Sequence, residues 1–174
     1  MSTRYSTLAT TLTTELQSQL TAITSLVIER RLTPRLDRAE FHDSKVYLGV
    51  YVGSAGWEIF ARQVDKQEWE ILLGIQAAVP KPDANASGNP FGAVTTSARD
   101  PVAWGDSVFE IVEKIKDLWR AEDEAGNPAG PLRSKLIANC DFLGLVHDPV
   151  YVPDHLLELG IMTSIVSLRY KVED

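Results

Sequence analysis

The sequence predicts an α+β fold, in which amphipathic helices pack on one face of a single, mostly antiparallel β-sheet. Two stretches, near the N-terminus and after residue 100, carry apolar residues at the three- and four-residue spacing of a helix. Several other segments alternate apolar and polar residues, as strands with one buried face do. The 174 residues fit one domain, 1–174, because no internal repeat and no change of composition marks a boundary.

The N-terminal helix is predicted over about residues 6–24. Its apolar stripe consists of Leu8, Leu12, Leu16, Leu20, Ile23 and Val27. Serine and threonine fill the opposite side, which predicts a surface that faces solvent. The stripe would also suit a coiled-coil seam, but it is shorter than three heptads, which favours burial against the chain's own sheet.

The segment LVIERRLTPRL after this helix mixes aliphatic and charged residues around Pro34. Proline cannot donate to a sheet ladder, so Pro34 confines the segment to a sheet edge or to an extended arm. An extended arm would be free to pair with another chain. Arg30, Arg31 and Pro34 are therefore candidate residues of a subunit interface.

The middle of the chain predicts consecutive strands with short connections. Residues 45–52 (KVYLGVYV) alternate between an aliphatic face and one with two tyrosines, and residues 53–56 (GSAG) predict a turn. The segments 58–64 and 69–79 follow as further strands of the same sheet, separated by a charged connection. This arrangement favours an antiparallel meander.

A polar run of about twenty residues, 80–99, separates these strands from the next helix. A connection of that length without periodicity is typical of a binding loop, a lid or a disordered linker. Phe91, the lone aromatic residue of the run, either folds back or inserts into a neighbour. Phe91 and Arg99 are therefore further candidates for a subunit interface, through long loops that reach between subunits.

The main helix is predicted over about residues 100–121. Asp100 is a suitable N-cap, and Pro101 follows at the first helical position, where its missing N–H costs nothing. The apolar residues at helical spacing are Trp104, Val108, Ile111, Val112, Ile115, Leu118 and Trp119. An apolar stripe of this length must be buried against another apolar surface. We therefore expect this helix to lie across the apolar face of the sheet.

The C-terminal part predicts a second exposed loop, a short helix and a closing strand. Glycines and prolines in AEDEAGNPAGPLRS end the main helix. The sequence DHLLEL is typical of one helical turn capped by Asp154. Residues 161–172 alternate between apolar and polar side chains, which predicts the closing strand.

The composition argues against several classes of protein. A net charge of -7, with no Lys/Arg cluster beyond residues 29–31, does not suit a nucleic-acid-binding module, although DNA could pass such a surface without sticking. Cys140 is the only cysteine, so there is no disulfide framework, and a reducing cytosol suits the chain. The N-terminal residues lack the apolar core of a signal peptide, and no apolar run approaches a membrane span. We expect neither export by a signal peptide nor a membrane location.

Candidate catalytic and metal-binding residues lack the spacing that such sites need. His147 and His155 lie eight residues apart with Asp148 and Asp154 between them, which suits neither a helical nor a strand metal site. Nothing beside Cys140 in the sequence activates a thiol, which favours a small buried thiol over a nucleophile. We therefore expect no catalytic residue, no cofactor and no metal. A small metal-dependent hydrolase that uses the two histidines is the weakest alternative.

The four tryptophans are more than a small domain needs for its core. Trp69, Trp104 and Trp119 fall on predicted apolar faces and are assigned to the core. Trp57 follows the predicted glycine turn, which makes it the strongest candidate for an aromatic residue at an interface.

Four segments, 27–53, 69–80, 100–119 and 148–172, resemble in this order small virion proteins of long-tailed bacteriophages and prophages. The shared features are an ER-x-x-x-P arm, an IGVQ-like strand before a loop and helix, a DP-x-Y-x-P-x-H-L turn, and an F-x-S-V-x-x-L-x-Y-x-V closing strand. The matching residues are Glu29, Arg30, Pro34, Ile75, Gln76, Asp148, Pro149, Tyr151, Pro153, His155, Leu156, Met162, Ser164, Ile165, Leu168, Tyr170 and Val172, with Met162 in place of the usual aromatic residue.

The family that these segments resemble is that of the tail terminator, or tail completion, proteins. The resemblance spans about four fifths of the chain and implies an α+β fold and a hexameric ring that caps the tail tube. It implies as partners further copies of the chain, the tail tube protein and the head-tail connector, with DNA only as cargo in the lumen. The implied location is the virion tail near the head-tail junction, after assembly in the host cytoplasm. A head-tail connector or neck completion protein is the alternative in the same class.

Overall fold

The computed structural model describes residues 4–42, 44–60, 64–79, 101–122, 126, 129–133 and 140–173. These residues form one five-stranded sheet with three α-helices, which confirms the predicted α+β class. The helices are α1 (Arg4–Gln19), α2 (Pro101–Arg120) and α3 (Pro153–Leu159), and the strands are β1 (Leu26–Arg30), β2 (Val46–Phe60), β3 (Val64–Ala78), β4 (Cys140–His147) and β5 (Ile161–Glu173). The strand order is β1-β2-β3-β5-β4, and every neighbouring pair except β1 and β2 is antiparallel.

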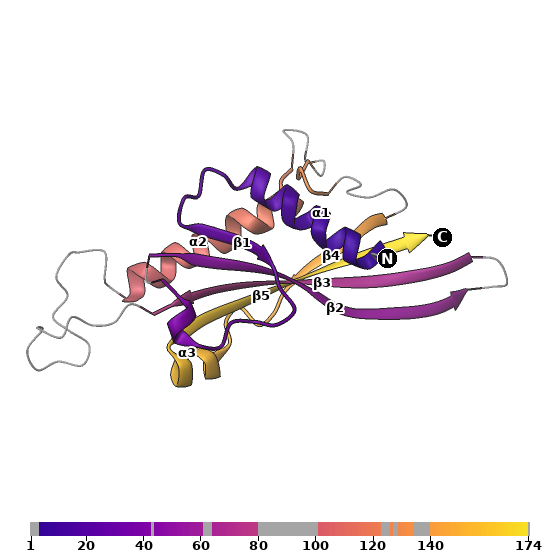
Figure 1. The fold of residues 1–174 in the computed structure, drawn as a ribbon. Helices are drawn as coiled ribbons and strands as arrows, with labels where there is room; N and C mark the ends of the chain where they lie inside the picture. The colour runs from indigo at the N-terminus through magenta and orange to yellow at the C-terminus, as the bar shows by residue number, and fades with distance from the viewer. Residues whose placement is uncertain are drawn as a thin grey trace, which may run out of the picture.

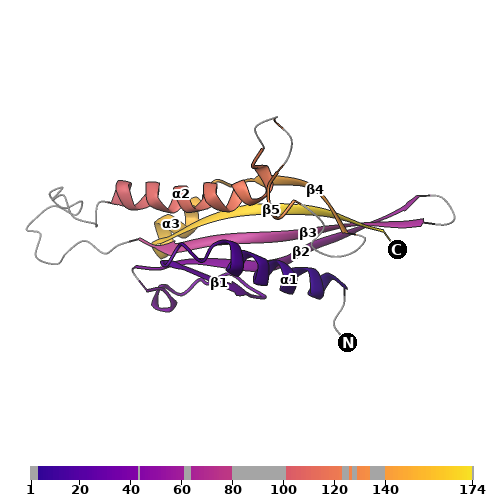
Figure 2. The same ribbon diagram turned by 90° about the horizontal axis from the view of Figure 1, so that it is seen from above.

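The two long helices lie over the same face of the sheet, as predicted (Figures 1 and 2). We call this the helix face and the opposite one the arm face. Leu8, Leu12 and Leu16 are fully buried against the sheet, because a four-residue spacing places them on one side of α1. The helix ends at Gln19, before the predicted residue 24, since the following residues turn the chain back into β1.

The register of the three central strands builds the core on the helix face. Leu48 of β2 lies opposite Ile75 of β3, and Leu73 of β3 lies opposite Val166 of β5. All four side chains are fully buried. The predicted alternation of these strands is therefore confirmed.

The arm face carries the tyrosines of β2. The ring of Tyr51 lies over Gly49 and over Gly74, its partner on β3. A Cβ atom would come within 2.4 Å of a Tyr51 ring carbon at Gly49 and within 2.7 Å at Gly74. The paired glycines therefore let an aromatic ring lie directly on the backbone of the sheet.

Trp119 fills the core where α2 crosses β5. It is fully buried, and its Nε1–H donates to Tyr170 Oη at 3.3 Å. Trp69 is buried as well, so two of the three predicted core tryptophans are confirmed, and Trp104 is partly buried and packs against the core. Asp100, the predicted N-cap of α2, lies outside the described residues. No helix in the described part of the chain combines the length and the apolar character that crossing a membrane requires.

The hairpin of β2 and β3 is longer than predicted. The predicted turn at residues 53–56 is wrong, because β2 continues through it to Phe60, with a register shift between Val52 and Ala55. Glycine and small residues suit a β-bulge as well as a turn, so the composition alone did not separate the two. The pair of strands extends past the layer of helices (Figures 1 and 2).

The strand order differs from the predicted meander in two places. β1 runs parallel to β2, because the connection 31–45 is long enough to return the chain to the end of the sheet where β1 begins. β5 lies between β3 and β4, where its 13 residues match most of the 15-residue β3, and the 8-residue β4 takes the edge.

The short helix α3 lies on the arm face, unlike the two long helices (Figure 1). Its N-cap is Val152, which makes no side-chain hydrogen bond, so the predicted cap at Asp154 is wrong. Asp154 lies in the first turn instead, where its charge is favourable at the positive end of the helix dipole. The closing strand predicted over residues 161–172 is confirmed as β5.

Candidate interaction surface

The segment 31–42, which we call the arm, belongs to the connection from β1 to β2 and crosses the arm face of the sheet. Its anchor is Gln76 of β3, which is 1% exposed. Arg35 N–H donates to Gln76 Oε1 at 3.0 Å, and Gln76 Nε2 donates to Arg35 O at 2.9 Å. Gln76 Nε2 also donates to Thr163 Oγ1 of β5 at 3.3 Å. The arm is therefore fixed to the sheet of its own chain.

A cluster of four charged residues also holds the arm. Glu40 Oε2 accepts from Arg31 at 3.4 Å and from Arg35 at 3.1 Å, and Glu29 pairs with both arginines. The Arg35 guanidinium lies 4.5 Å from the centre of the Tyr47 ring. Burial acts to lower the pKa of Arg35, but the hydrogen bond and charge of Glu29, with the charge of Glu40, raise it. The cluster keeps Arg35 charged and paired.

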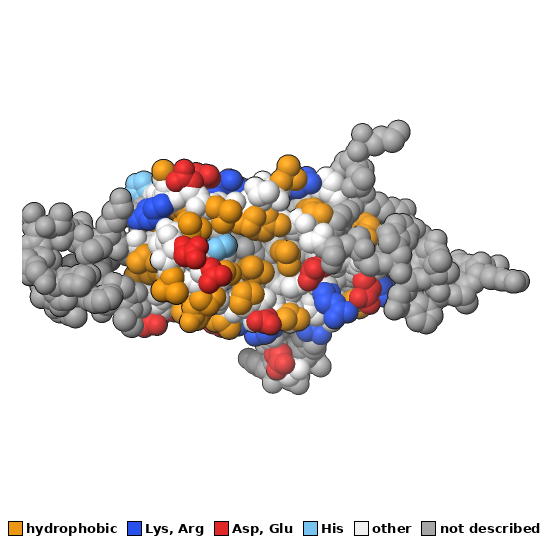
Figure 3. All heavy atoms as spheres, turned by 90° about the horizontal axis from the view of Figure 1, so that it is seen from below, with side chains coloured by type: hydrophobic (Ala, Val, Ile, Leu, Met, Phe, Trp, Pro, Cys, Tyr) orange, Lys and Arg blue, Asp and Glu red, His pale blue; other side chains and the backbone are white. Residues whose placement is uncertain are grey.

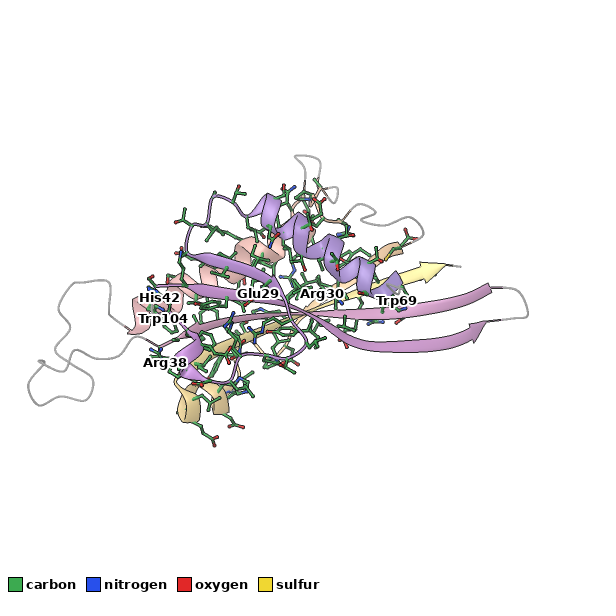
Figure 4. The ribbon with its side chains drawn as sticks, viewed as in Figure 1. Glu29, Arg30, Arg38, His42, Trp69 and Trp104 are labelled. Carbon is green, nitrogen blue, oxygen red and sulfur yellow. The ribbon has the colours of Figure 1, made fainter. Side chains whose placement is uncertain are left out.

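The arm residues that were predicted as interface candidates have different surroundings. Arg31 lies in the charge cluster, whereas Arg30 donates from β1 to Thr10 Oγ1 of α1 at 3.0 Å. Figure 4 shows Arg30 and Glu29 near the middle of the molecule. Pro34 is exposed on the arm. The predicted edge position of this segment agrees with β1 as the first strand of the sheet, but its arm is bound within the chain.

The remaining interface candidates have no described side chains. Trp57 belongs to β2 by its backbone, and nothing is described of its side chain. Phe91, Arg99 and the whole predicted loop 80–99 lie outside the described residues.

Both ends of the sheet leave strand edges without a described strand partner. β1 pairs with residues 46–50 of β2, and Arg31 N–H adds one more hydrogen bond to Val50 O at 3.1 Å. Residues 51–60 of β2 have no further strand beside them among the described residues. β4 is the last strand at the other end. We call these the β2 edge, residues 51–60, and the β4 edge, the outer side of residues 140–151.

Large hydrophobic side chains are exposed near both edges and on the arm face. Those of the described chain are Leu32 and Leu36 on the arm, Val52 on the β2 edge, Leu143, Val146, Val150 and Tyr151 on the β4 edge, and Leu157 on α3. Figure 3 shows hydrophobic side chains gathered on the molecule as seen from below, with charged groups between and around them. Exposed apolar groups that gather in this way are typical of an interaction surface.

The two histidines of the hydrolase alternative lie on different faces of the sheet. His147 contacts Ser164 Oγ at 2.7 Å, and His155 contacts Thr163 Oγ1 at 3.0 Å. Thr163 and Ser164 are neighbours on β5, so their side chains point to opposite faces. The pair His147 and Ser164 is no exposed nucleophile either, because Ser164 is fully buried. No group of three or more potential metal ligands occurs among the described residues.

Cys140 is buried, as the sequence predicted. Burial, with a smaller effect from the charge of Asp141, raises the pKa of its thiol to about 11. Cys140 lies opposite Val172, whereas His147 lies opposite Val166, at the other end of β4. Among the described residues, His147 therefore lies too far along β4 to act as a base for this thiol.

His147 makes the stability of the fold depend on pH. Burial lowers the pKa of His147 below its usual value of 6.5, and the charge of Lys116 lowers it further. The unfolded chain therefore takes up the proton more readily than the folded one. The contribution of neutral His147 to stability is complete above pH 6.5 and is lost as the pH falls through that value toward the lower pKa of the folded state.

Replacement His147→Gln is expected to reduce this pH dependence. Urea unfolding at pH 7.5 and pH 5 should show a smaller loss of unfolding free energy on acidification for H147Q than for the original chain. His42→Gln is the matched control, because His42 is exposed. Equal pH dependence in H147Q and the original chain would contradict the assignment.

Sequence reasoning missed the residues that fix the arm. Gln76 was one polar residue in the otherwise apolar run LGIQAAV, and that exception was the available signal. Its partner Arg35 is 41 residues away, so no local pattern links the two. The exposed Leu143 and Val146 lie on β4, whose sequence CDFLGLVH has no regular alternation of apolar and polar residues.

In comparisons with known proteins, no family model and no curated protein sequence matches this chain.

Proposed function

We propose that this chain is a structural, non-enzymatic virion protein that joins with copies of itself into a ring, by hypothesis of six. The ring caps the tail tube of a long-tailed phage, ends its polymerisation and joins the tail to the head-tail connector. The proposal starts from the resemblance of segments 27–53, 69–80, 100–119 and 148–172 to tail terminator proteins. The structural observation that carries it is the pair of strand edges, at opposite ends of one sheet, that have no strand partner among the described residues.

Unpaired strand edges support an assembly role because each is a template for another strand. Single-chain proteins usually blunt such edges with charges, prolines or cover. The β4 edge carries Asp141, Asp148 and Pro149, but it also exposes aliphatic side chains, Leu143 at 45% and Val146 at 48%. An edge of this kind suits a protein that works in contact with other chains.

The polar groups that hold the arm support a structural role more than catalysis. The charge cluster of the arm satisfies its own members, and its two arginines pair with Glu29 and Glu40. The side chain of the buried Gln76 also forms its hydrogen bonds with the arm and with β5. These groups fix the shape of the surface, and they do not direct a nucleophile, an acid or a base toward a common point.

The net charge of -7 suits a ring through which DNA passes. An acidic surface repels the phosphate backbone, so DNA would cross the lumen without being held. The proposed location is the virion tail at the head-tail junction, after assembly in the host cytoplasm.

The test is to add the purified protein to growing tail tubes and, separately, to tail-free capsids. The proposal predicts binding at tube ends and an arrest of tube growth, both visible by electron microscopy. Binding to capsids without binding to tubes would instead support the connector alternative. Binding to neither would contradict both.

A further inference from the structure

The β4 edge is a continuous strip in which strand and loop follow one another. After His147 the chain stays beside β5, because Ile165 N–H donates to Pro149 O at 3.3 Å and Val152 N–H donates to Thr163 O at 2.8 Å. The strip thus extends beyond β4 by a further loop. Its exposed large hydrophobic residues are Leu143, Val146, Val150 and Tyr151.

The β2 edge has its own apolar group of different composition. Val52 is 40% exposed on the first stretch of β2 that β1 does not cover. Leu32 is 92% exposed and directly follows Arg31, whose N–H bonds Val50 O. The two ends of the sheet therefore present different apolar surfaces.

The two ends also differ in charge. Residues 140–159, which form the β4 edge and α3, contain four acidic residues and no lysine or arginine. Residues 26–46, which form β1, the arm and the start of β2, contain five lysines and arginines and four acidic residues. The acidic ends of two copies would repel each other, whereas the acidic end of one copy would attract the more basic end of another.

Strand direction is compatible with contact between the two ends. Three antiparallel steps lead from β2 through β3 and β5 to β4, so β4 runs antiparallel to β2. Rotation about an axis along the strands preserves strand direction. The β4 edge of one copy would then meet the β2 edge of the next copy as an antiparallel pair.

We propose that the β4 edge of one copy packs head to tail against the β2 edge and the adjoining arm of a second copy. This inference rests on the proposed ring and specifies which surfaces form it. The contact is heterologous, since two different surfaces meet, and such contacts generate rings when the rotation closes. The fixed arm has a role in this contact: Gln76 and the charge cluster hold Leu32 and the basic residues in place before the partner arrives.

Two variants disable one edge each. The β4-edge variant carries Leu143→Lys and Val146→Lys, which place positive charge against the more basic end. The β2-edge variant carries Leu32→Lys and Val52→Lys, which bury unpaired charge in the apolar contact and, in a mixture, repel the lysines of the mutated β4 edge. All four residues are exposed, so the fold should tolerate the changes, and thermal unfolding of each variant checks this. Leu157→Lys, on the exposed surface of α3, is the control.

The masses of the separate and mixed variants decide the inference. At concentrations where the original chain and L157K form the ring, each edge variant alone should be a monomer. An equimolar mixture should form a heterodimer and nothing larger, because one intact β4 edge meets one intact β2 edge. Analytical ultracentrifugation up to the highest soluble concentration provides the measurement.

Other outcomes contradict the inference in distinguishable ways. A dimer of either variant alone would indicate a two-fold contact of like edges. A monomeric mixture, or rings of unchanged mass from either variant, would overturn contact between these two edges while leaving the proposed ring in place. An original chain that stays monomeric at every concentration would contradict both the inference and the ring.

Discussion

Replacement of Trp119 by alanine is expected to lower the free energy of unfolding by about 3–5 kcal/mol. The side chain is fully buried, and its Nε1–H donates to Tyr170 Oη at 3.3 Å. Its ring also lies 6.4 Å from the ring of Phe142, between centroids. The change would therefore remove a large apolar contact and leave a cavity between α2 and the sheet. Urea unfolding followed by circular dichroism measures the loss.

Trp104→Ala on the same helix is the matched control. Trp104 is only half-buried, near the other end of α2, so its replacement should cost about 1 kcal/mol. The same substitution thus tests two positions that the sequence placed together on one stripe. Equal losses at the two positions would contradict the description of the core.

Replacement of Gln76 by leucine is expected to cost about 2–3 kcal/mol and to release the arm. Leucine keeps the volume but cannot bond Arg35 N–H or Arg35 O, so both backbone groups lose their partner. The readout specific to the arm is limited trypsin digestion, since the arm contains Arg31, Arg35 and Arg38. Cleavage after these residues should be faster in the variant than in the original chain, even when the two are compared at equal free energy of unfolding.

Gln17→Leu is the control for the loss of a glutamine. Gln17 is exposed on α1 and donates one hydrogen bond, to Ile28 O at 2.9 Å. Its replacement should cost less than about 1 kcal/mol and leave cleavage in the arm unchanged. If Q76L and Q17L behaved alike, the arm would not depend on Gln76.

The elements with a regular apolar period were predictable from the sequence. Leu8, Leu12 and Leu16 repeat with the period of a helix. The large apolar residues of β3 and β5 alternate with the period of a strand, because they lie on the side of the sheet that faces the helices. Strand direction does not alter that period, so the parallel pairing of β1 with β2 was not predictable. The bulge in β2 was read as a turn because its glycines suit both structures.

The candidate surface was predicted only in part. Pro34 indicated that its segment lies at an edge, which β1 as first strand agrees with. The anchor of the arm depends on Gln76 and Arg35, which only the folded sheet brings together. The edge position of β4 depends on the insertion of β5 beside β3, a long-range choice that no local pattern encodes.

The native mass of the purified chain tests the central claim, assembly into a closed ring, most directly. Light scattering coupled to size exclusion should give one sharp species of about six times the 19.2 kDa chain, with no continuous series of larger species. A single species of 19.2 kDa at all concentrations, or open polymers of increasing length, would contradict the ring.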